Sequence, residues 1–376
     1  MNQNNTYERL LDEVTSGASV EPRDYQARII QRAWREYESG TIRSVLVHSP
    51  TGSGKTVIAL LIAAGLQLRH GLKIGWVAMR RNLLEQAKKE IEQRKIPVQA
   101  TFISMFDRNP PSNLDVLIVD EAQHDCTNSM MTIHGIVRPR FIVGLSATPF
   151  RVDRLRLCFD SVIRDAGIHQ LIQDGYLSPF HHFTIPRFRP EEVADCYLRH
   201  VDRWGKSIFY FPTIAQCRRA ADRLASGGVS VEVVTGASDR EGQLEDFRSG
   251  KVQVLVNSQV LVEGMDEPTL KTVFCRPSSC APTIQMCGRV LRKHPEFPFK
   301  QVVQCQETRW PIMRTASAAA QFTWMDGQWR SLTENENIVD ISRRTVRALA
   351  MTQIALPTFL QQGLRRTRNE ARVGIE

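Results

Sequence analysis

The sequence predicts an α/β protein with two similar parallel-sheet domains in tandem. Residues 41–150 alternate short apolar runs with helix-compatible segments, which is typical of parallel strands connected by helices. A second alternation of the same kind begins near Lys206. A Gly-rich turn between a predicted strand and a predicted helix, SPTGSGKT at residues 49–56, is a third sign of this fold class.

The strands of the first domain are expected at SVLV (44–47), IGWVAM (74–79), VLIVD (116–120) and FIVGLS (141–146). Those of the second are expected at SIFYF (207–211), VEVVTG (231–236), VQVLVN (252–257) and TVFCR (272–276). The helix after the Gly-rich turn ends with Arg69 and His70, and Gly71 is placed as its C-cap. Between the domains, residues 165–190 predict a helix followed by a proline-rich connector.

These patterns divide the chain into four segments. Residues 1–19 form an N-terminal leader, residues 20–180 the first domain, residues 181–300 the second, and residues 301–376 a basic extension that is mainly helical. HPEFPF (294–299) predicts a turn or loop. The extension contains several arginines, for which a solvated helical face is the default interpretation and nucleic-acid contact the alternative. They are Arg343, Arg344, Arg347, Arg365, Arg366 and Arg368.

Composition is that of a globular protein with a basic surface. The 376 residues are 42% hydrophobic and 24% charged, and the net charge is +9. A basic excess of this size favours a polyanionic partner such as nucleic acid, although an ordinary basic enzyme would also show it. The apolar run at residues 57–68 is too short to span a bilayer, and the polar N-terminus lacks the layout of a signal peptide, so a cytoplasmic location is expected. Eight cysteines without a Cys-x-x-Cys pair indicate reduced thiols.

The Gly-rich turn has the chemistry of a phosphate-binding loop. Glycines let successive backbone N–H groups curl around a phosphate, so the loop residues Thr51, Gly52, Ser53 and Gly54 are expected to contact one. Lys55 supplies a positive charge for the outer phosphates, and the hydroxyl of Thr56 suits Mg²⁺. The alternative is an ordinary Gly- and Ser-rich turn.

Two further strand ends carry polar side chains. Asp120 and Glu121 follow the strand VLIV, and the carboxyl ends of parallel strands face the ligand crevice. Asp120 is expected to hold Mg²⁺ and Glu121 to activate water, although adjacent acids also suit a helix N-cap and first turn. Ser146 and Thr148 follow the strand FIVGL and either form a simple turn or relay the state of the phosphate.

The segment IQMCGRVLRK (284–293) predicts a helix with two different faces. Its apolar side chains fall on one face and are expected to pack on the second domain. Gln285, Gly288, Arg289 and Arg292 fall on the other, which faces a crevice. The arginines form either ordinary surface salt bridges or an arginine finger that completes the nucleotide site.

In chain order the motifs are RDYQ (23–26), SPTGSGKT (49–56), DEAQH (120–124), SATPFR (146–151), LVEGMDEP (261–268) and QMCGRVLR (285–292). Residues 20–295 thereby resemble the superfamily 2 helicases, and most closely the branch with the XPB-type and type III restriction translocase motors. The resemblance implies two RecA-like domains that use ATP and Mg²⁺. It implies that Gln26, with Arg23 nearby, reads adenine, and that Gln285, Arg289 and Arg292 sense the γ-phosphate. It also implies that Gly264 and Asp266 link the nucleotide to the nucleic acid.

Looser matches imply contacts with the nucleic-acid backbone. In the first domain these residues are Arg80, Arg81, Thr101 and Ser104, and in the second they are Thr235, Gly236, Asn257 and Ser258. The sequence departs from many relatives at Gln123 and His124, where DEAQ followed by His replaces DEAH or DECH. Both acids are kept, so hydrolysis is expected, while coupling through Gln123 differs.

The expected function is that of an ATP-dependent DNA helicase or branch-remodelling translocase from a bacterium or a phage. An RNA helicase is the first alternative, because the preference for DNA rests on analogy. An ATP-switched nucleic-acid loader with little turnover is the second. Partner proteins from replication or recombination fit the first expectation.

Overall fold

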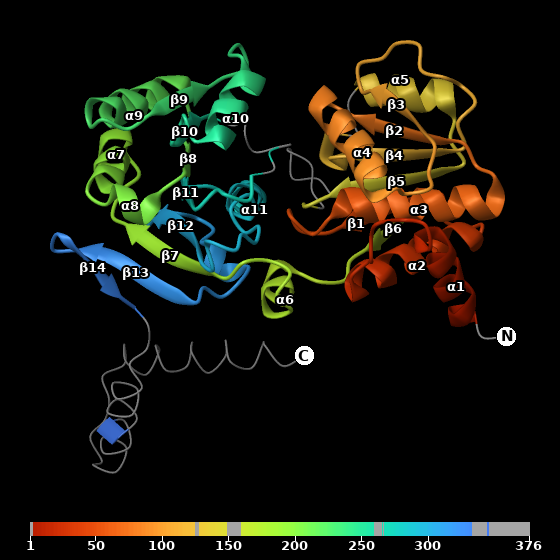
Figure 1. Ribbon diagram of the computed structural model, residues 1–376, viewed down its shortest axis with the longest axis horizontal. Helices are drawn as coiled ribbons and strands as arrows, with labels where there is room; N and C mark the ends of the chain where they lie inside the picture. The colour runs from red at the N-terminus through yellow and green to blue at the C-terminus, as the bar shows by residue number, and fades with distance from the viewer. Residues whose placement is uncertain are drawn as a thin grey trace, which may run out of the picture. The chain divides into compact units, whose positions relative to one another are not determined.

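The computed structural model contains two mainly parallel sheets, each covered by helices (Figure 1). The residues described are 3–124, 128–148, 159–258, 265, 267–332 and 344–345. The chain divides into two units, Met1–Arg330 with both sheets and Ser331–Glu376. Most of the expected basic helical tail, including Arg343, Arg347, Arg365, Arg366 and Arg368, therefore lies outside the described residues. No described helix is both long and apolar enough to cross a lipid bilayer.

The first sheet has six parallel strands in the order β3-β2-β4-β5-β1-β6. The strands are β1 (Ser44–His48), β2 (Ile74–Ala78), β3 (Ala100–Ser104), β4 (Val116–Asp120), β5 (Phe141–Ser146) and β6 (Ser161–Ile163). The helices are α1 (Gln3–Thr15), α2 (Asp24–Glu38), α3 (Lys55–His70), α4 (Arg81–Arg94), α5 (Asn128–Val137) and the 3₁₀ turn η1 (Ala122–His124). The expected strands of this domain are thus confirmed.

Strand alternation distributes the apolar side chains between two cores. Val45 and Val47 belong to the core that contains α3 and α4, whereas Leu46 belongs to the core that contains α5. Helix α3 is apolar all round and buried from Val57 to Leu66, as expected for a helix enclosed by a sheet on one side and other helices on the other. Gly71 ends it in a left-handed conformation, which confirms the predicted C-cap.

The expected N-terminal leader contains a helix that packs on the first domain. The side chains of Tyr7, Leu10, Leu11 and Val14 on α1 are all buried in the core that also contains α2 and α3. The Tyr7 hydroxyl donates a hydrogen bond to Glu38 on α2 at 2.7 Å. The apolar face of α1 therefore contributes to the core of the first domain.

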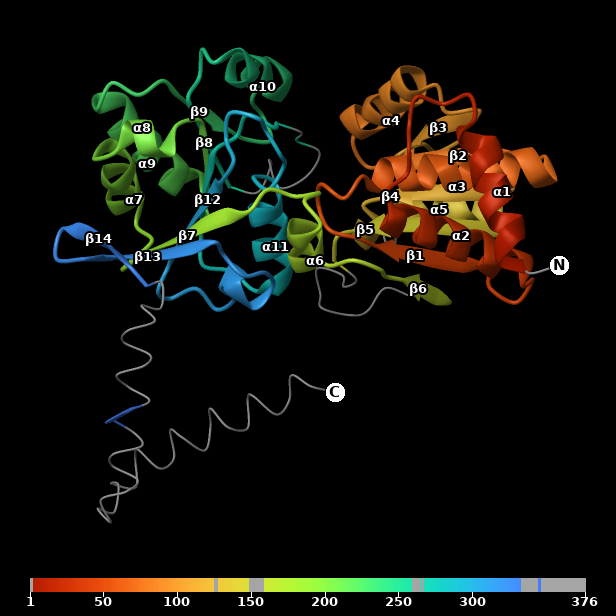
Figure 2. The same cartoon turned by 60° about the horizontal axis from the view of Figure 1, so that its bottom comes forward.

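The second sheet has eight strands in the order β14-β13-β7-β12-β11-β8-β10-β9 (Figure 2). They are β7 (Phe180–Ile185), β8 (Ser207–Tyr210), β9 (Val231–Val234), β10 (Val254–Asn257), β11 (Thr272–Cys275), β12 (Lys300–Cys305), β13 (Ala320–Met325) and β14 (Gln328–Ser331). The helices are α6 (Ile168–Gln173), α7 (Pro190–Leu198), α8 (Val201–Trp204), α9 (Ile214–Ser226), α10 (Arg240–Ser249), α11 (Cys280–Gly288) and η3 (Ile312–Arg314). Helices α7 and α9 cover one face, and α10 and α11 the other.

The second sheet corrects two expectations from the sequence. The segment 165–190 contains the expected helix, α6, but its proline-rich connector also contains β7, an interior strand. Two adjacent histidines make β7 look polar, yet His182 is buried and lies 3.1 Å from the Gln304 amide oxygen on β12. Strands β12, β13 and β14 continue the sheet beyond residue 300, where a separate extension was expected to begin. The domain boundaries themselves stay a prediction, while HPEFPF is a loop, as predicted.

Packing around Gly65 predicts a loss of stability for a substitution that helix propensity alone would favour. A Cβ at Gly65 on α3 would lie 2.2 Å from the ring of Trp34, which is buried and donates a hydrogen bond to the Ile62 carbonyl. Gly65→Ala is therefore expected to lower the free energy of unfolding by about 1–3 kcal/mol, although alanine favours a helix. Urea denaturation monitored by circular dichroism would measure this change.

Gly135 on α5 provides the matched control. A Cβ there would meet no atom within 4 Å, so Gly135→Ala is expected to gain up to about 1 kcal/mol from helix propensity. Equal gains in the two variants would contradict the proposed clash at Gly65.

Candidate nucleotide site

The phosphate-loop candidate connects the end of β1 to the start of α3. The amide of Ser49 donates to the Ser146 carbonyl at 3.1 Å, so the loop begins against the end of β5. Within the loop, the Ser49 hydroxyl lies 2.7 Å from that of Ser53. Lys55 is the first residue of α3, and its Nζ donates to the Pro50 carbonyl at 3.2 Å. The ammonium group therefore points back into the loop.

Two glycines let neighbouring segments approach the loop closely. Gly52 and Gly54 have φ values of 82° and 78°, in the left-handed region that disfavours other residues. A Cβ at Gly54 would lie 2.7 Å from the Gln26 side-chain nitrogen, and one at Gly52 would lie 3.1 Å from Leu177. Both the conformation and the packing therefore require glycine at position 54.

Arg23 and Gln26 lie at the start of α2, beside the loop. Gln26 accepts a hydrogen bond from the Arg23 amide at 3.0 Å, and its side-chain nitrogen donates to the Ser53 carbonyl at 2.9 Å. The Tyr25 hydroxyl donates to the same carbonyl at 2.6 Å. The Gln26 amide thus ties α2 to the loop.

The two acids lie at the carboxyl end of β4. Asp120 is almost fully buried, and burial together with the nearby Glu121 raises its pKa to about 7, against the opposing charge of Lys55. Burial in turn lowers the pKa of Lys55, which the Glu121 and Asp120 carboxylates oppose. Glu121 has a φ of 52°, a left-handed conformation that is unusual for a residue with a side chain and common at functional turns.

A chain of hydrogen bonds runs from Glu121 to the end of β5. The Gln123 side-chain nitrogen donates to Glu121 at 2.9 Å, and the Ser146 hydroxyl lies 2.8 Å from the Gln123 side-chain oxygen. The same hydroxyl lies 2.6 Å from the Thr148 carbonyl and accepts from the Thr148 amide at 3.1 Å. The structure thus brings Gln123, Ser146 and Thr148 together with Glu121. The side chain of His124 lies outside the described residues.

The segment 284–293 differs in one respect from its predicted form. Helix α11 ends at Gly288, and tighter bonds from the amides of Arg289 and Val290 to residues three positions earlier continue the chain. The apolar side chains of the segment are buried, as predicted: Met286, Cys287, Val290 and Leu291. A Cβ at Gly288 would lie 2.9 Å from the Cβ of Thr51, so the end of α11 lies directly against the phosphate loop.

Both arginines of this segment face the site. Arg289 is 6% exposed and donates to the Met265 carbonyl at 3.2 Å. Burial lowers the pKa of Arg292 to about 10, and the Glu90 carboxylate on α4 opposes this shift. The second domain therefore contributes two largely desolvated guanidinium groups.

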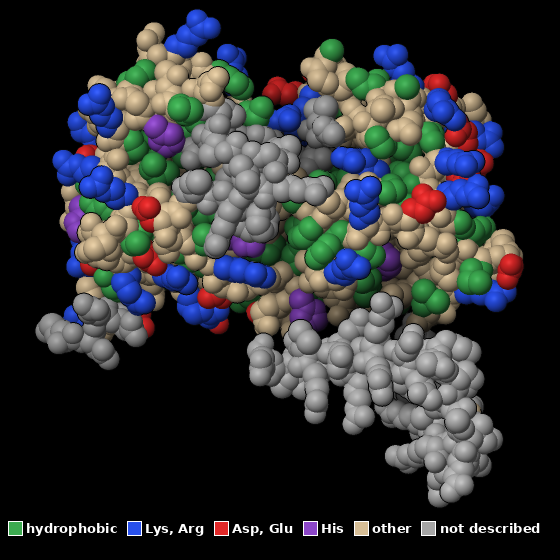
Figure 3. All heavy atoms as spheres, turned by 180° about the vertical axis from the view of Figure 1, so that it is seen from behind, with side chains coloured by type: hydrophobic (Ala, Val, Ile, Leu, Met, Phe, Trp, Pro, Cys, Tyr) green, Lys and Arg blue, Asp and Glu red, His purple; other side chains and the backbone are tan. Residues whose placement is uncertain are grey.

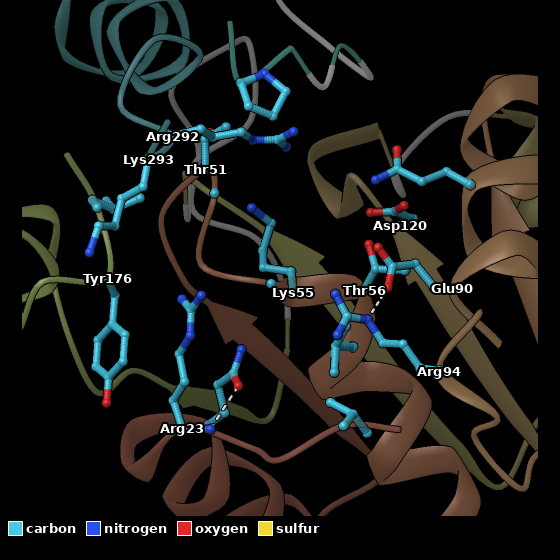
Figure 4. Close-up of a pocket in the computed structure, with 18 of the residues that line it drawn as sticks. Arg23, Thr51, Lys55, Thr56, Glu90, Arg94, Asp120, Tyr176, Arg292 and Lys293 are labelled. Atoms are coloured by element: carbon cyan, nitrogen blue, oxygen red, sulfur yellow. Dashed lines mark hydrogen bonds and ion pairs between the residues drawn. The ribbon is translucent and has the colours of Figure 1, made fainter. Parts of the chain in front are cut away.

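A cavity of about 540 Å³ joins these groups (Figure 4). Among the predicted site residues, those that line it are Arg23, Gln26, Thr51, Gly52, Gly54, Lys55, Thr56, Asp120, Glu121, Arg289 and Arg292. Ser53 is fully buried behind the loop, and Gln285 is not part of the cavity wall. Gly264 and Asp266 lie outside the described residues, although Met265 between them lines the cavity.

Sequence reasoning missed several residues with polar groups at the cavity: Ser19, Glu21, Gln86, Glu90, Arg94, Tyr176 and Lys293. Glu90 and Arg94 on α4 form an ion pair, and the Lys293 ammonium donates to the Gly175 carbonyl at 2.8 Å. Tyr176 contributes an aromatic ring. None of them belongs to a motif with phosphate or metal chemistry, so the sequence offers no signal that would have identified them.

The predicted nucleic-acid contacts separate into two groups. Arg80, Arg81 and Ser104 lie at the carboxyl ends of β2 and β3, and Thr235, Gly236 and Ser258 follow β9 and β10. Thr101, by contrast, is the second residue of β3, and Asn257 is fully buried with its amide donating to the Phe209 carbonyl at 3.2 Å. On the face that Figure 3 shows, Lys and Arg side chains are spread over both domains rather than gathered in one patch.

Two parallel-sheet domains with a phosphate loop, an acid pair whose first member is buried and arginines from the second domain define a tandem RecA-like nucleotide-binding fold. Family models agree: the type III restriction enzyme res subunit matches residues 19–109, and the helicase conserved C-terminal domain matches residues 189–294. The chain belongs to the superfamily 2 helicases, which confirms the resemblance found in the sequence.

Two curated relatives have names that describe them as helicases. "Putative helicase 22" of Sulfolobus islandicus filamentous virus is 26% identical over 73% of this chain and 62% of its own length. "Putative ATP-dependent helicase IRC3" of Saccharomyces cerevisiae is 24% identical over 72% of this chain and 49% of its own. The chain thus spans only about half to three-fifths of these relatives.

Two solved structures share the fold at low identity. The type ISP restriction-modification enzyme LlaBIII, bound to DNA, has a TM-score of 0.57 and 16% identity over 75% of this chain and 27% of its own. Dbp5 of S. cerevisiae, bound to RNA and ADP BeF₃, has a TM-score of 0.51 and 17% identity over 75% of this chain and 87% of its own. These likenesses confirm the predicted fold class.

His48, the last residue of β1, gives a prediction about pH. Burial, with the nearby Arg164, lowers its pKa from 6.5 to about 4. As the pH falls from 7 to 5, the unfolded chain protonates this imidazole while the folded chain does not, so the free energy of unfolding decreases. We expect His48→Asn to remove about 1 kcal/mol of this acid-induced decrease, measured by urea denaturation at both pH values. An unchanged difference between pH 7 and pH 5 would contradict the shift.

Proposed function

We propose that this chain is a nucleic-acid-stimulated ATPase that uses ATP hydrolysis to move along and remodel DNA. One observation carries the proposal. Lys55, the acid pair and two arginines line a single cavity, although the arginines come from the second sheet domain. A γ-phosphate held between them would connect the two domains, and its loss on hydrolysis would release that connection.

The residues present fit a magnesium–nucleotide complex. The cavity has a glycine cradle at Gly54 and a lysine at the N-terminus of α3, where backbone N–H groups favour phosphate. Asp120 is a buried carboxylate whose raised pKa shows that the surrounding cations compensate its charge incompletely. Together with the Thr56 hydroxyl, it supplies the hard oxygen ligands that Mg²⁺ prefers. When bound, Mg²⁺ would neutralise charge on the phosphate oxygens.

Hydrolysis then requires a positioned water and stabilisation of the developing charge. The Glu121 carboxylate, which accepts a hydrogen bond from the Gln123 amide, would orient or deprotonate the water. Arg289 and Arg292 stabilise charge on the transferred phosphoryl group from the second domain. The hydrogen bonds through Ser146 would carry the state of Glu121 to the end of β5.

For the nucleic-acid strand we propose a path along the carboxyl ends of both sheets. Arg80, Arg81 and Ser104 would contact its backbone in the first domain, and Thr235, Gly236 and Ser258 in the second. Cations, hydroxyls and backbone N–H groups suit phosphate contacts that carry no sequence information. Opening and closing of the cavity would then shift one group of contacts relative to the other.

DNA is the favoured substrate, and forked or branched DNA the favoured form. The match to the type III restriction enzyme res subunit and the fold shared with the DNA-bound LlaBIII support DNA. The fold shared with RNA-bound Dbp5 supports an RNA helicase as the second candidate. Because both similarities concern the shared motor fold, an assay with both nucleic acids must decide between them.

Three substitutions test the hydrolytic site. Lys55→Ala, Glu121→Gln and Arg289→Ala are each expected to lower the rate of ATP hydrolysis by roughly 10² to 10⁵, because each removes a group that acts on the phosphates or the water. The measurement is steady-state release of phosphate, with circular dichroism to confirm folding. A Glu121→Gln protein with full turnover would refute the role given to that carboxylate.

The same assay identifies the nucleic acid. ATP hydrolysis by the parental protein is measured alone and with single-stranded DNA, duplex DNA, forked DNA and RNA. Stimulation that is greatest with forked DNA supports the proposal. Stimulation by RNA alone selects the RNA helicase, and ATP-dependent binding without turnover selects a switched loader.

The proposed strand path predicts a change in salt dependence. Binding of single-stranded DNA should weaken as salt increases, and Arg81→Ala should make the slope of log K against log salt shallower by about one unit. Fluorescence anisotropy over a salt series measures both slopes. Arg140, just before β5 and thus at the amino edge of the same sheet, is the matched control. An Arg140→Ala slope reduced as much as that of Arg81→Ala would contradict the path.

A further inference from the structure

The second sheet domain contains a smaller cavity, of about 220 Å³, between α7 and the end of β13. One wall is the indole of Trp324 on β13, and another is Arg187, which follows β7. The remaining polar wall comes from α7 and its C-cap, at spacings of three and four that form one helix face: Glu192, Asp195, Cys196 and Arg199. Trp324 lies beyond residue 294, where the match to the helicase C-terminal domain ends, so that match does not account for this cavity.

The Trp324 ring is held in place by aromatic packing. Its centroid lies 5.1 Å from that of Trp329 on β14, at an interplanar angle of 70°. Trp329 in turn packs edge to face with Phe183 and Trp204 in the core of the domain. Over the Trp324 ring lies the guanidinium group of Arg199, an exposed side chain, 5.2 Å from the centroid. The partly exposed indole is therefore a preformed surface that a flat ligand can reach when the flexible Arg199 side chain moves.

The charges around the ring favour an anion. The two acids of the α7 wall are each paired with an arginine from outside the cavity: Asp195 with Arg223 on α9 at 2.7 Å, and Glu192 with Arg189 at 3.7 Å. Arg187 and Arg199, by contrast, have no ion-pair partner among the described residues. Two exposed cations beside a tryptophan are thus left to attract negative charge.

We propose that this cavity is a second binding site for single-stranded nucleic acid, in which Trp324 stacks one base and Arg187 and Arg199 contact the flanking phosphates. The inference rests on the proposed function, because it extends the proposed strand path. An aromatic surface combined with basic side chains is the arrangement with which proteins hold single strands irrespective of sequence. The cavity is smaller than the roughly 300–1,000 Å³ that encloses a whole drug-sized ligand, so it accepts one base of a strand rather than a free nucleotide.

The cavity lies within reach of the proposed strand path. Strands β7, β12, β11, β8 and β10 are successive parallel neighbours, so their carboxyl ends share one edge of the sheet. Arg187 follows β7 at that edge, and Ser258 of the strand path follows β10. Four strand spacings of about 4.8 Å separate β7 from β10, which is about 19 Å. A stacked strand covers this distance with about six nucleotides at about 3.4 Å each, so a longer strand contacts both.

Binding of a fluorescent oligo(dT) of about 20 nucleotides, which is long enough to span both places, tests the site by anisotropy without ATP. Trp324→Ala is expected to weaken binding about tenfold, from the loss of one stacked base, and to leave the slope of log K against log salt unchanged. Arg187→Ala should instead make that slope shallower by about one unit. An abasic strand of the same length should bind Trp324→Ala as tightly as the parental protein, because it has phosphates and no bases.

Trp310 provides the matched control. Its ring also lies beneath an arginine, with the Arg314 guanidinium carbon 5.3 Å from the centroid, and it is partly exposed like Trp324. It lies next to η3, which packs with α11 on the opposite face of the sheet from α7. Trp310→Ala should therefore change neither the affinity nor the salt slope. Trp324→Phe, which keeps a ring, should bind oligo(dT) within about threefold of the parental protein.

Photocrosslinking supplies a readout that a purely structural role of Trp324 would not give. Oligo(dT) with one 5-iododeoxyuridine, placed at each position in turn, is irradiated with the parental protein, and the crosslinked peptides are identified by mass spectrometry. The site predicts a crosslink to Trp324 from at least one position. Its absence at every position would overturn the proposal.

Two binding results would also overturn it. One is binding of oligo(dT) by both Trp324→Ala and Arg187→Ala that equals that of the parental protein, with circular dichroism to confirm that the variants fold. The other is an equal loss of oligo(dT) and abasic binding in Trp324→Ala, which would mean that the indole only supports the fold around the arginines.

These results are separable from those that test the proposed function. A parental protein that binds oligo(dT), with a shallower slope in Arg81→Ala and no effect of Trp324→Ala or Arg187→Ala, keeps the strand path and loses only this site. A parental protein that binds neither oligo(dT) nor the abasic strand overturns the path and the site together, while the substitutions at Lys55 and Glu121 still decide whether the chain hydrolyses ATP.

Discussion

The close packing of the phosphate loop against two segments from farther along the chain is the constraint on which the site depends. Gly52 leaves just enough space for Leu177, and the end of α11 at Gly288 reaches Thr51. Side chains larger than hydrogen at these positions would force the segments apart. Glycine therefore serves two purposes here, since it gives the loop its left-handed turns and lets the arginine-bearing segment come within reach of the phosphates.

This packing places charges where water cannot solvate them well. The pKa values of Lys55 and Arg292 are lowered and that of Asp120 is raised, in each case mainly by burial. Each shift moves the group toward its neutral form, which means that the charged site is electrostatically costly. A ligand that brings both phosphate oxygens and a divalent cation offsets both kinds of cost at once. The site is thus organised for a metal–nucleotide complex more than for either part alone.

The sequence predicts the parts of this protein that depend on local pattern. Val45, Leu46 and Val47 show a buried strand, Gly71 shows a helix end, and the order of the motifs shows the family. The sequence does not predict β7, because its two histidines make the segment look polar although the neighbouring strands and helices bury it. Nor does it predict Tyr176, whose place at the cavity depends on contacts between distant segments. Asn257 shows the opposite case, a polar residue that fits a surface pattern but is fully buried in the fold.

The Ser146 hydroxyl lies between two hydrogen-bond acceptors. It has a single proton and two acceptors within reach, the Gln123 side-chain oxygen and the Thr148 carbonyl. It can donate fully to only one of them at a time, so the two acceptors compete for this proton. A change at Glu121 that turns the Gln123 amide would alter which of the two oxygens accepts the Ser146 proton. The Ser146 hydroxyl therefore connects the orientation of the Gln123 amide to the backbone at the end of β5.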